Sequence, residues 1–263
     1  MTGTGAPPAQ PTSVVLGISP VVVVMSITEK SAPWGSLIAA NRPNGVSIGP
    51  NRSPPPRPGR PGHGFAWPWS VYRWLEGVNP VVGTVAAPGS LATDLAAYIT
   101  ALRGLDTADA PACHRGVPLA TRDAPTREAI AQLTGRTDTE AVTARWEEAL
   151  TAPAYTGPPV WAHGDLSPGN LLTDGGRLTA VIDFGSVGAG DPAVDLIVAW
   201  NLLPAGVRGV FREAVGADEA EWARGRGWAL SIALIQLPYY WDTNPALAAN
   251  SRHVIGEILA ERR

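Results

Sequence analysis

The chain carries little charge and almost no cysteine. Only 16% of its 263 residues are charged, and the net charge is −3 with a pI near 5.8. A nucleic-acid-binding domain usually has a basic face, so this balance argues against nucleic acid as a partner. The single cysteine, Cys113, excludes an internal disulfide and a cysteine-based zinc site, and it fits a reducing cytosol. The four histidines show no metal-ligand spacing.

No hydrophobic run has the length needed to span a membrane. The most apolar stretch, Val14 to Ile27, is short and contains Gly17 and Pro20. It does not resemble a signal peptide, because no Lys or Arg precedes it and no small-residue cleavage pattern clearly follows. We therefore expect a soluble cytoplasmic protein without a membrane partner, in which this stretch forms one or two strands.

Acidic residues are nearly absent from the first 62 residues. Glu29 is the only one there, whereas the same part holds nearly half of the 26 prolines. The segment at about 50–62 is too rich in proline for a helix or a central strand, because proline fixes φ and lacks an N–H donor. We predict an extended linker there, within an irregular N-terminal lobe at 1–76. A second unit, mainly helical, is predicted at 77–263.

Helices in the second unit are predicted from capping residues and apolar periodicity. They comprise Leu91 to Leu105 after the cap Ser90, Asp138 to Leu150 with the capping box Thr137 and Glu140, a helix opening at Asp191-Pro192, Glu219 to Leu237, and a last helix opening at Asn244-Pro245. A mixture of these helices with short strands predicts the α+β class.

Two β-prone runs flank a turn signal in the middle of the helical unit. Leu171 to Thr173 and Leu178 to Ile182 are joined by Asp174-Gly175-Gly176, a sequence typical of hairpin turns. A hairpin brings its two ends together. Asn170, just before it, and Asp183, just after it, are therefore predicted to be neighbours.

Three polar residues follow the order that a phosphoryl-transfer site requires. In kinases, a catalytic-loop Asp is followed five residues later by Asn, and a second Asp begins the motif Asp-Phe-Gly. Here Asp165 follows His163-Gly164 and precedes Asn170 by the same spacing, and Asp183 begins Asp-Phe-Gly. Mg²⁺ prefers oxygen ligands and binds triphosphates with one or two protein groups. The pattern predicts Asp165 as the base that accepts a hydroxyl proton, with Asn170 and Asp183 as magnesium ligands.

From about residue 62 to 263 the chain resembles the aminoglycoside phosphotransferase family, which has a protein-kinase-like fold. The matching segments are Trp67 to Gly77, Val160 to Leu172, Val181 to Gly185, Gly190 to Leu196 and Leu237 to Pro245. The resemblance implies two lobes, a reduced β lobe and a mainly helical catalytic lobe. It also implies transfer of the γ-phosphate of ATP or GTP to a hydroxyl of a small molecule. An aminoglycoside-type antibiotic is one such acceptor, and the activity would then confer antibiotic resistance.

The resemblance further implies roles for residues around the motif. The hinge between the lobes would contact the purine through the backbone of Tyr72, Arg73, Trp74 and Leu75. The catalytic loop would be supported by His163, Asp191 and Asp195, although a local pairing on a helix face also explains Asp195. The acceptor pocket would be lined by Tyr239, Tyr240, Trp241 and Asp242, with simple packing as an equal explanation for the aromatic rings. Further acidic groups for a polycationic acceptor would be Glu257 and Glu261, which a solvated helix face explains equally well.

The first sixty residues depart from the family. A small-lobe strand should carry a cation that pairs with the phosphates, and a helix Glu should orient it. The run Val21 to Ser26 has no Lys or Arg, and Lys30 lies beyond it, next to Glu29. Divergence and a disrupted reading frame both explain this departure. Two alternatives therefore stand beside the antibiotic kinase: a degenerate or truncated member that binds ligand without turnover, and a kinase of a metabolic alcohol such as choline.

Overall fold

The computed structural model describes residues 75–261 and, before them, only the backbone of five short strands. These strands are β1 (Leu16–Gly17), β2 (Val22–Val24), β3 (Ser47–Ile48), β4 (Arg57–Gly59) and β5 (Trp69–Val71). β1 pairs with β3 and β4 with β5, both antiparallel. The linker predicted at about 50–62 is thus interrupted by β4.

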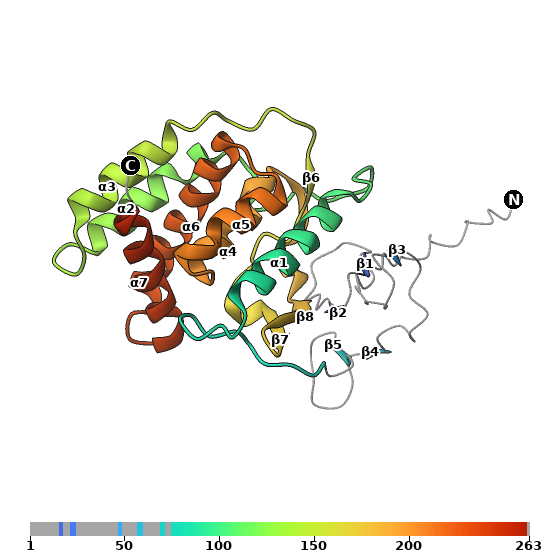
Figure 1. Ribbon diagram of the computed structural model, residues 1–263. Helices are drawn as coiled ribbons and strands as arrows, with labels where there is room; N and C mark the ends of the chain where they lie inside the picture. The colour runs from blue at the N-terminus through green and yellow to red at the C-terminus, as the bar shows by residue number, and fades with distance from the viewer. Residues whose placement is uncertain are drawn as a thin grey trace, which may run out of the picture.

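The remainder of the chain is mainly helical, which confirms the predicted α+β class (Figure 1). The helices are α1 (Pro88–Arg103), α2 (Asp123–Gln132), α3 (Thr139–Leu150), α4 (Val198–Asn201), α5 (Ala205–Val215), α6 (Glu219–Tyr240) and α7 (Pro245–Ala260). The strands are β6 (Val160–Ala162), β7 (Leu171–Asp174), β8 (Arg177–Ile182) and β9 (Gly188–Gly190). Short 3₁₀ helices are η1 (Leu119–Arg122), η2 (Pro168–Asn170), η3 (Phe184–Ser186) and η4 (Pro192–Ile197).

Two of the predicted N-terminal signals are confirmed. The side chain of Asp191 accepts a hydrogen bond from the amide of Ala193 at 3.0 Å, and Pro192 then opens η4, which leads into α4. Asn244 accepts from the amide of Leu247 at 3.1 Å at the start of α7. In both places the cap satisfies an amide that the helix leaves free.

Two other helix starts differ from the prediction. α1 begins at Pro88, so Ser90 lies in its first turn and caps nothing. Proline at the first position was the signal there, because its missing N–H costs nothing at that point. α3 begins at Thr139 and is capped by Asp138, which accepts from the amide of Ala141 at 2.9 Å, and not by Thr137.

The core of the described part is built around α6. This helix packs against α7, η4, α2 and α3, while α1 packs against α5, β6 and β8. Three tryptophans of the helical part are fully buried: Trp146 of α3, Trp200 of α4 and Trp228 of α6. Burial of such large rings contributes strongly to stability, since each removes a large apolar area from water. The helical layer therefore provides a rigid base for the short strands.

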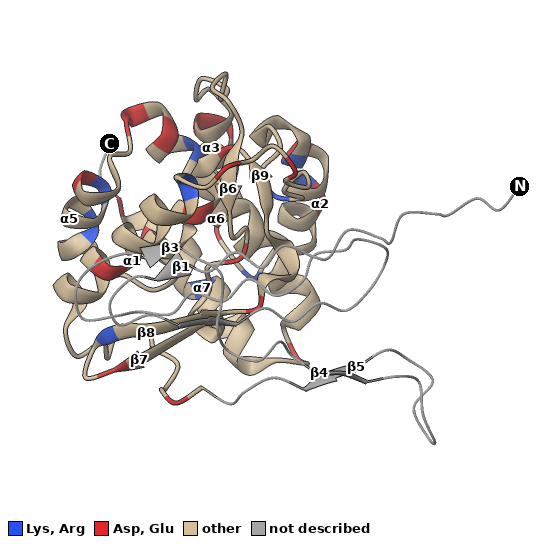
Figure 2. Ribbon diagram, turned by 90° about the vertical axis from the view of Figure 1, so that its right-hand side faces the viewer, with Lys and Arg blue, Asp and Glu red and all other residues tan. Residues whose placement is uncertain are grey.

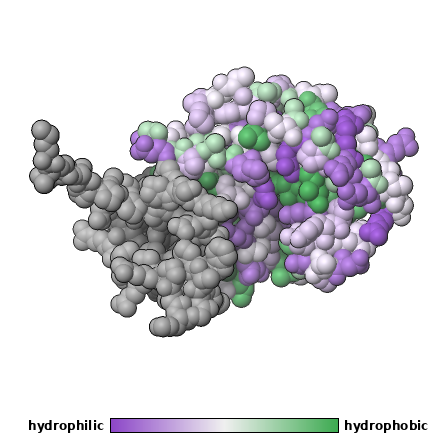
Figure 3. Space-filling view, turned by 180° about the vertical axis from the view of Figure 1, so that it is seen from behind, coloured by the Kyte–Doolittle hydropathy of each residue, from purple (hydrophilic) through white to green (hydrophobic). Residues whose placement is uncertain are grey.

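The surface of this part shows no separation of charge. Acidic and basic residues are interspersed along the helices, as Figure 2 shows. On the face seen in Figure 3, hydrophobic residues form small separate patches among polar ones. Among the described residues, no helix is both long and apolar enough to cross a membrane.

Candidate active site

The predicted hairpin forms and holds the two candidate metal ligands at one end. β7 and β8 pair antiparallel with Leu171 opposite Val181, so Asn170 and Asp183 flank the open end of the hairpin. The turn at the other end uses Gly175 and Gly176, both with positive φ, +55° and +80°. Such angles are readily adopted only by glycine, which explains the sequence of this turn.

The hairpin is fastened to α1 by a residue that the motif analysis did not find. Asp94 of α1 accepts two hydrogen bonds of 2.7 Å from the guanidinium of Arg177 and one of 3.1 Å from the amide of Leu178. A bidentate pair of this kind fixes orientation as well as distance. Figure 1 shows the hairpin beside this helix. Because Asp94 lies 83 residues before its partner, no local pattern indicated the contact.

The segment after the predicted hinge also contacts the hairpin. Val78 exchanges two backbone hydrogen bonds of 2.9 and 2.8 Å with Thr173 of β7. The side-chain amide of Asn79 donates to the carbonyl of Leu171 at 2.7 Å and to that of Gly169 at 3.0 Å. Asn79 thereby restrains the turn that carries Asn170. Of the four predicted hinge residues, Leu75 is half-buried, while Tyr72, Arg73 and Trp74 lie outside the described residues.

The loop after β6 is held by a buried carboxylate. Asp195, in η4, accepts hydrogen bonds of 2.8 Å from the backbone amides of both His163 and Gly164. Burial raises the pKa of Asp195, and the two amides and the nearby Arg103 oppose that rise. A carboxylate that accepts two backbone amides fixes the position of the loop, which places Asp195 in a supporting role.

His163 supports the same loop from within the core. Its Nδ1 accepts from the amide of Asp165 at 3.2 Å, and its Nε2 lies 3.1 Å from the carbonyl of Ile182. These partners require a neutral ring with the proton on Nε2. The ring also packs edge-on against Phe184, at 4.7 Å between centroids. Burial lowers the pKa of His163, which agrees with the neutral form.

Asp165 lies partly exposed at the end of this loop. One carboxylate oxygen, Oδ1, is 2.5 Å from Nη1 of Arg115, and the other, Oδ2, is 3.3 Å from the side-chain amide of Asn170. The same amide donates to the backbone carbonyl of Asp165 at 2.9 Å. Asp165 and Asn170 are therefore in direct contact, as neighbours in one site. Arg115 was not indicated by any motif in the sequence.

Asp183 has an unusual backbone conformation for a residue with a side chain. Its φ of 61° is positive, and it is the only such residue other than glycine in the described part of the chain. Conformations of this kind cost about 1–3 kcal/mol and persist where the surrounding structure requires them. The side chain of Asp183 is exposed and accepts one long hydrogen bond, 3.4 Å, from the amide of Gly185. Its carboxylate is thus left largely available for a ligand.

The remaining predicted support residue, Asp191, forms a buried ion pair. Arg224 of α6 donates to its two oxygens at 2.7 and 3.3 Å, and both side chains are almost completely buried. Arg224 also donates to the carbonyl of Pro153 at 2.8 Å. This pair joins α6 to the strand β9 that precedes Asp191. Both oxygens of Asp191 are engaged by Arg224 in the interior, whereas Asp165 is partly exposed and Asp183 is exposed.

The predicted acceptor residues lie at the end of α6 and in the turn that follows it. Tyr239 and Tyr240 end α6 and stack edge to face, with Tyr239 largely exposed. Trp241 lies between two arginines, with Arg136 at 4.6 Å and Arg252 at 5.3 Å from its ring centre. Asp242 is exposed. Within residues 75–261, no hydrogen bond, ion pair or ring contact connects Tyr239–Asp242 with the catalytic loop.

Glu257 and Glu261 do not form a solvated helix face. The almost fully buried Arg208 binds Glu257 at 2.5 Å and Glu261 at 3.2 Å. Glu261 also accepts from the indole of Trp200 at 2.6 Å. Both carboxylates are partly exposed and are paired with arginine, and their contact with a polycationic acceptor stays a prediction.

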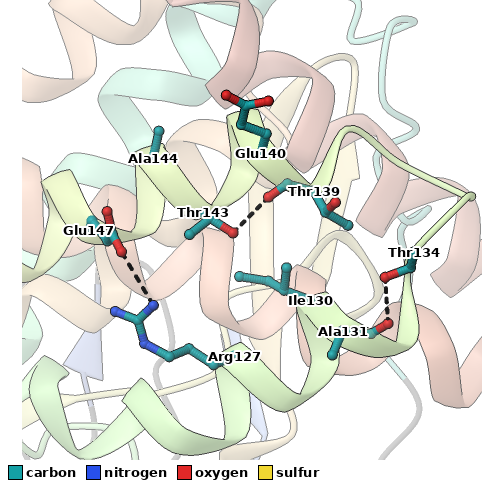
Figure 4. Close-up of a pocket in the computed structure, with 9 residues that line it drawn as sticks. All are labelled: Arg127, Ile130, Ala131, Thr134, Thr139, Glu140, Thr143, Ala144 and Glu147. Atoms are coloured by element: carbon teal, nitrogen blue, oxygen red, sulfur yellow. Dashed lines mark hydrogen bonds and ion pairs between the residues drawn. The ribbon is translucent and has the colours of Figure 1, made fainter.

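A groove between α2 and α3 lies elsewhere (Figure 4). It has a volume of about 570 Å³, and several of its polar side chains are engaged in local contacts. Arg127 lies 3.4 Å from Glu147, and the hydroxyl of Thr143 donates to the carbonyl of Thr139 at 2.6 Å. None of the predicted site residues lines it.

One glycine determines whether the catalytic loop can form. Gly164 has a φ of +77°, and a Cβ there would lie 2.8 Å from the carbonyl oxygen of Ser186. We expect Gly164→Ala to destabilise the protein by about 1–3 kcal/mol, through backbone strain and this clash. Urea unfolding followed by circular dichroism would measure the change.

Gly169 provides the matched control in the same loop. It has no positive φ, and a Cβ there meets nothing within 4 Å. Gly169→Ala should therefore leave the urea midpoint nearly unchanged. Equal midpoints for the two alanine variants would contradict the assigned role of Gly164.

Comparison with known proteins identifies the family to which this arrangement belongs. The family model described as the phosphotransferase enzyme family matches residues 46–228, more than half of the chain. The chain belongs to this phosphotransferase family. Two members named aminoglycoside 3'-phosphotransferase, from Escherichia coli and Salmonella typhimurium, are each 40% identical to it over 58 residues. The match covers 22% of this chain and 21% of each of these curated relatives, so it spans about a fifth of their length.

Solved structures confirm the predicted fold for this member of the phosphotransferase family. The GDP complex of an aminoglycoside 2'-phosphotransferase IIIa is similar with a TM-score of 0.55 and 21% identity, covering 75% of this chain and 72% of that one. A ternary complex of an aminoglycoside phosphotransferase with AMP-PNP and hygromycin B has a TM-score of 0.50 and 22% identity. It covers 78% of this chain and 76% of the other. The mainly helical α+β class with a kinase-like fold, as expected from the sequence, is therefore confirmed.

Proposed function

We propose that this protein transfers the γ-phosphoryl group of ATP or GTP to a hydroxyl of a small molecule. The observation that carries the proposal is the arrangement of Asp165, Asn170 and Asp183. The first two are in hydrogen-bond contact, and the third lies across the end of the same hairpin from Asn170. A partly exposed carboxylate beside two potential metal ligands is the constellation that phosphoryl transfer requires.

In the proposed reaction, Asp165 accepts the proton of the acceptor hydroxyl. The acceptor oxygen forms a new bond to the γ-phosphorus, and the bond from phosphorus to the bridging oxygen breaks. Its electron pair goes to the departing nucleoside diphosphate. The chain itself positions the base, since Asp195 and His163 hold the loop and Asn170 holds the backbone of Asp165. Positioning of this kind supplies much of the rate in phosphoryl transfer.

Asn170 and Asp183 have the chemistry of magnesium ligands. The amide nitrogen of Asn170 faces Asp165, so its amide oxygen is the atom left for a cation. Asp183 offers an exposed carboxylate that is engaged by only one long hydrogen bond. Two protein oxygens suffice for Mg²⁺ bound to a triphosphate, because the ion takes its other ligands from phosphate and water. When bound, the ion would neutralise charge on the phosphates.

The acceptor that we propose is an aminoglycoside-type polyhydroxylated amine. Its support comes from the names of the relatives, which are aminoglycoside phosphotransferases. We retain Asp242 as an acidic contact for a cationic acceptor, with Tyr239, Tyr240 and Trp241 beside it. We also retain the hinge Tyr72 to Leu75 as the purine contact. A metabolic alcohol such as choline is the second candidate acceptor, and the assay below distinguishes the two.

The test is an assay with γ-labelled nucleotide. The full chain is incubated with Mg²⁺ and labelled ATP or GTP, together with aminoglycosides, macrolides, choline or sugar alcohols. We expect label in the aminoglycoside products and in none of the others. Label in choline alone would favour the metabolic kinase. Nucleotide binding without transfer to any acceptor would support the degenerate member instead.

Asp183 should control binding of the magnesium nucleotide. We expect millimolar Mg-ATP to raise the melting temperature of the wild type, because a ligand that binds only the folded state stabilises it by about 2.7 kcal/mol at 100 times its Kd. Asp183→Asn should lose most of this rise, since it loses a negative charge at the metal. Thermal-shift titration measures both proteins.

Asp174→Asn serves as the matched control. Asp174 is exposed at the opposite end of the same hairpin, and its replacement removes the same charge. It should keep the full Mg-ATP response. If the two variants respond alike, Asp183 is not a ligand of the magnesium nucleotide.

A further inference from the structure

Arg115 is the only Lys or Arg among residues 75–261 that makes a hydrogen bond or ion pair with Asp165, Asn170 or Asp183. Its Nη1 lies 2.5 Å from Oδ1 of Asp165 and 3.1 Å from the carbonyl oxygen of Gly164. Within that range its other guanidinium nitrogens make no hydrogen bond to the protein. The contact thus joins Arg115 to the two residues that define the end of the catalytic loop.

The loop that carries Arg115 is fixed on both sides. Before it, the amide of Cys113 donates to Ala189 of β9 at 2.9 Å. After it, the carbonyl of Gly116 accepts from the amide of Asp191 at 2.9 Å. β9 is in turn paired with β6, the strand that leads into the catalytic loop. The backbone of the Arg115 loop is therefore held against the same small sheet that leads into the catalytic loop.

Two glycines of β9 permit this close approach. A Cβ at Gly188 would lie 2.6 Å from the backbone nitrogen of Cys113, and one at Gly190 would lie 2.5 Å from the carbonyl oxygen of Gly116. Neither contact is tolerable, because the opposing atoms belong to the backbone. The sequence Gly188-Ala189-Gly190 is thus suited to bringing the Arg115 loop against the site.

Stability does not account for the contact between Arg115 and Asp165. Their side chains are 25% and 30% exposed, and partly exposed ion pairs contribute only about 0–1 kcal/mol. The fold is held instead by buried pairs such as Arg224 with Asp191. The ion pair with Arg115 instead affects the orientation of the Asp165 carboxylate. It holds Oδ1, whereas Oδ2 accepts only the long hydrogen bond of 3.3 Å from Asn170 and is the oxygen left for an incoming hydroxyl.

We infer that Arg115 is a positioning residue for phosphoryl transfer, which orients the carboxylate of Asp165 toward the acceptor. This inference rests on the proposed function. A carboxylate on a loop rotates about its side-chain bonds, and only some orientations place Oδ2 on the path of the hydroxyl proton. A guanidinium nitrogen that binds both the carboxylate and the Gly164 carbonyl restricts that rotation.

The test compares Arg115→Gln and Arg115→Lys with the wild type. We expect Arg115→Gln to lower kcat about 10- to 100-fold, with less than about a threefold change in acceptor KM, because misplacement of a reacting group by about 1 Å has effects of this size. The kcat of Arg115→Lys should lie between those of the wild type and Arg115→Gln. Added guanidinium ion should restore part of the activity of Arg115→Ala, which a general loss of structure would not allow.

Arg127→Gln is the matched control, since Arg127 is an exposed arginine of α2 that is remote from the site. Its kcat should equal that of the wild type. An unchanged kcat in Arg115→Gln would overturn the inference.

A second measurement separates this inference from the proposed function. Crystal structures of the wild type and Arg115→Gln should show one Asp165 rotamer in the former and several in the latter. This comparison requires no turnover. If the wild type transfers no phosphate, the proposed function fails while the rotamers still decide the role of Arg115. A single, unchanged rotamer would overturn the positioning role.

Discussion

Replacement of Asp165 by Asn is expected to lower kcat for phosphoryl transfer by a factor of about 10²–10⁴, the range for loss of a general base. The amide retains the size of the carboxylate, but it cannot take the proton of the acceptor hydroxyl. Steady-state assay with γ-labelled nucleotide and a saturating acceptor measures the change. The Kd of Mg-ATP should change little, because Asn170 and Asp183 remain in place.

Folding and charge effects need to be separated from this loss. Asp165 is partly exposed and lies at the end of its loop, so the melting temperature of Asp165→Asn should stay close to that of the wild type. Asp174→Asn removes the same charge from the exposed turn of the hairpin and should keep full kcat. Transfer by Asp165→Asn at the wild-type rate would show that another group is the base.

The largest effect on stability is expected from Asp191→Ala. This change leaves Arg224 buried without its anion and removes the cap of η4. Breaking a buried ion pair on one side typically costs about 3–5 kcal/mol, because the remaining charge is not solvated. Urea unfolding would show the loss as a lower midpoint at an unchanged slope.

Two further variants test whether the unpaired charge of Arg224 causes the loss of stability. Replacing both partners, with Asp191→Leu and Arg224→Met, should be less destabilising than Asp191→Ala, since no unpaired charge remains. Glu219→Gln breaks the exposed pair with Arg212, in which Glu219 is 84% exposed, and should leave the midpoint almost unchanged. If Asp191→Ala costs no more than Glu219→Gln, the buried pair does not stabilise the fold.

Local features of the fold were predictable because they depend on neighbours in sequence. The turn at Gly175-Gly176 requires positive φ, which glycine adopts readily, so the β7–β8 hairpin was predictable. The hairpin in turn predicted that Asn170 and Asp183 are neighbours. The caps at Asn244 and Asp191 were predictable because the amides that they bind lie only two or three residues further along the chain. The cap predicted at Ser90 was wrong, because serine is common both at caps and within first turns. Pro88 was the stronger signal for the start of the helix.

The supports of the site were not predictable in this way. Asn79 reaches the turn at Gly169 from 90 residues earlier, and Asp94 reaches Arg177 from 83 residues earlier. Glu257 and Glu261 have the spacing of a solvated helix face, yet both bind the buried Arg208. A glutamate has the same sequence signal whether its carboxylate is solvated or packed against a buried arginine, so the pairing with Arg208 was not predictable.

The sequence by itself determined the chemical groups and the order in which they occur: a base, an amide and a second carboxylate joined by a tight hairpin. It also determined the family, since those motifs are local and specific. Only the tertiary structure decided that Arg115 lies against Asp165. That contact depends on how closely the Cys113–Gly116 loop approaches β9, and the approach depends on the absence of side chains at Gly188 and Gly190. Contacts between distant segments follow from packing, which no short stretch of sequence encodes.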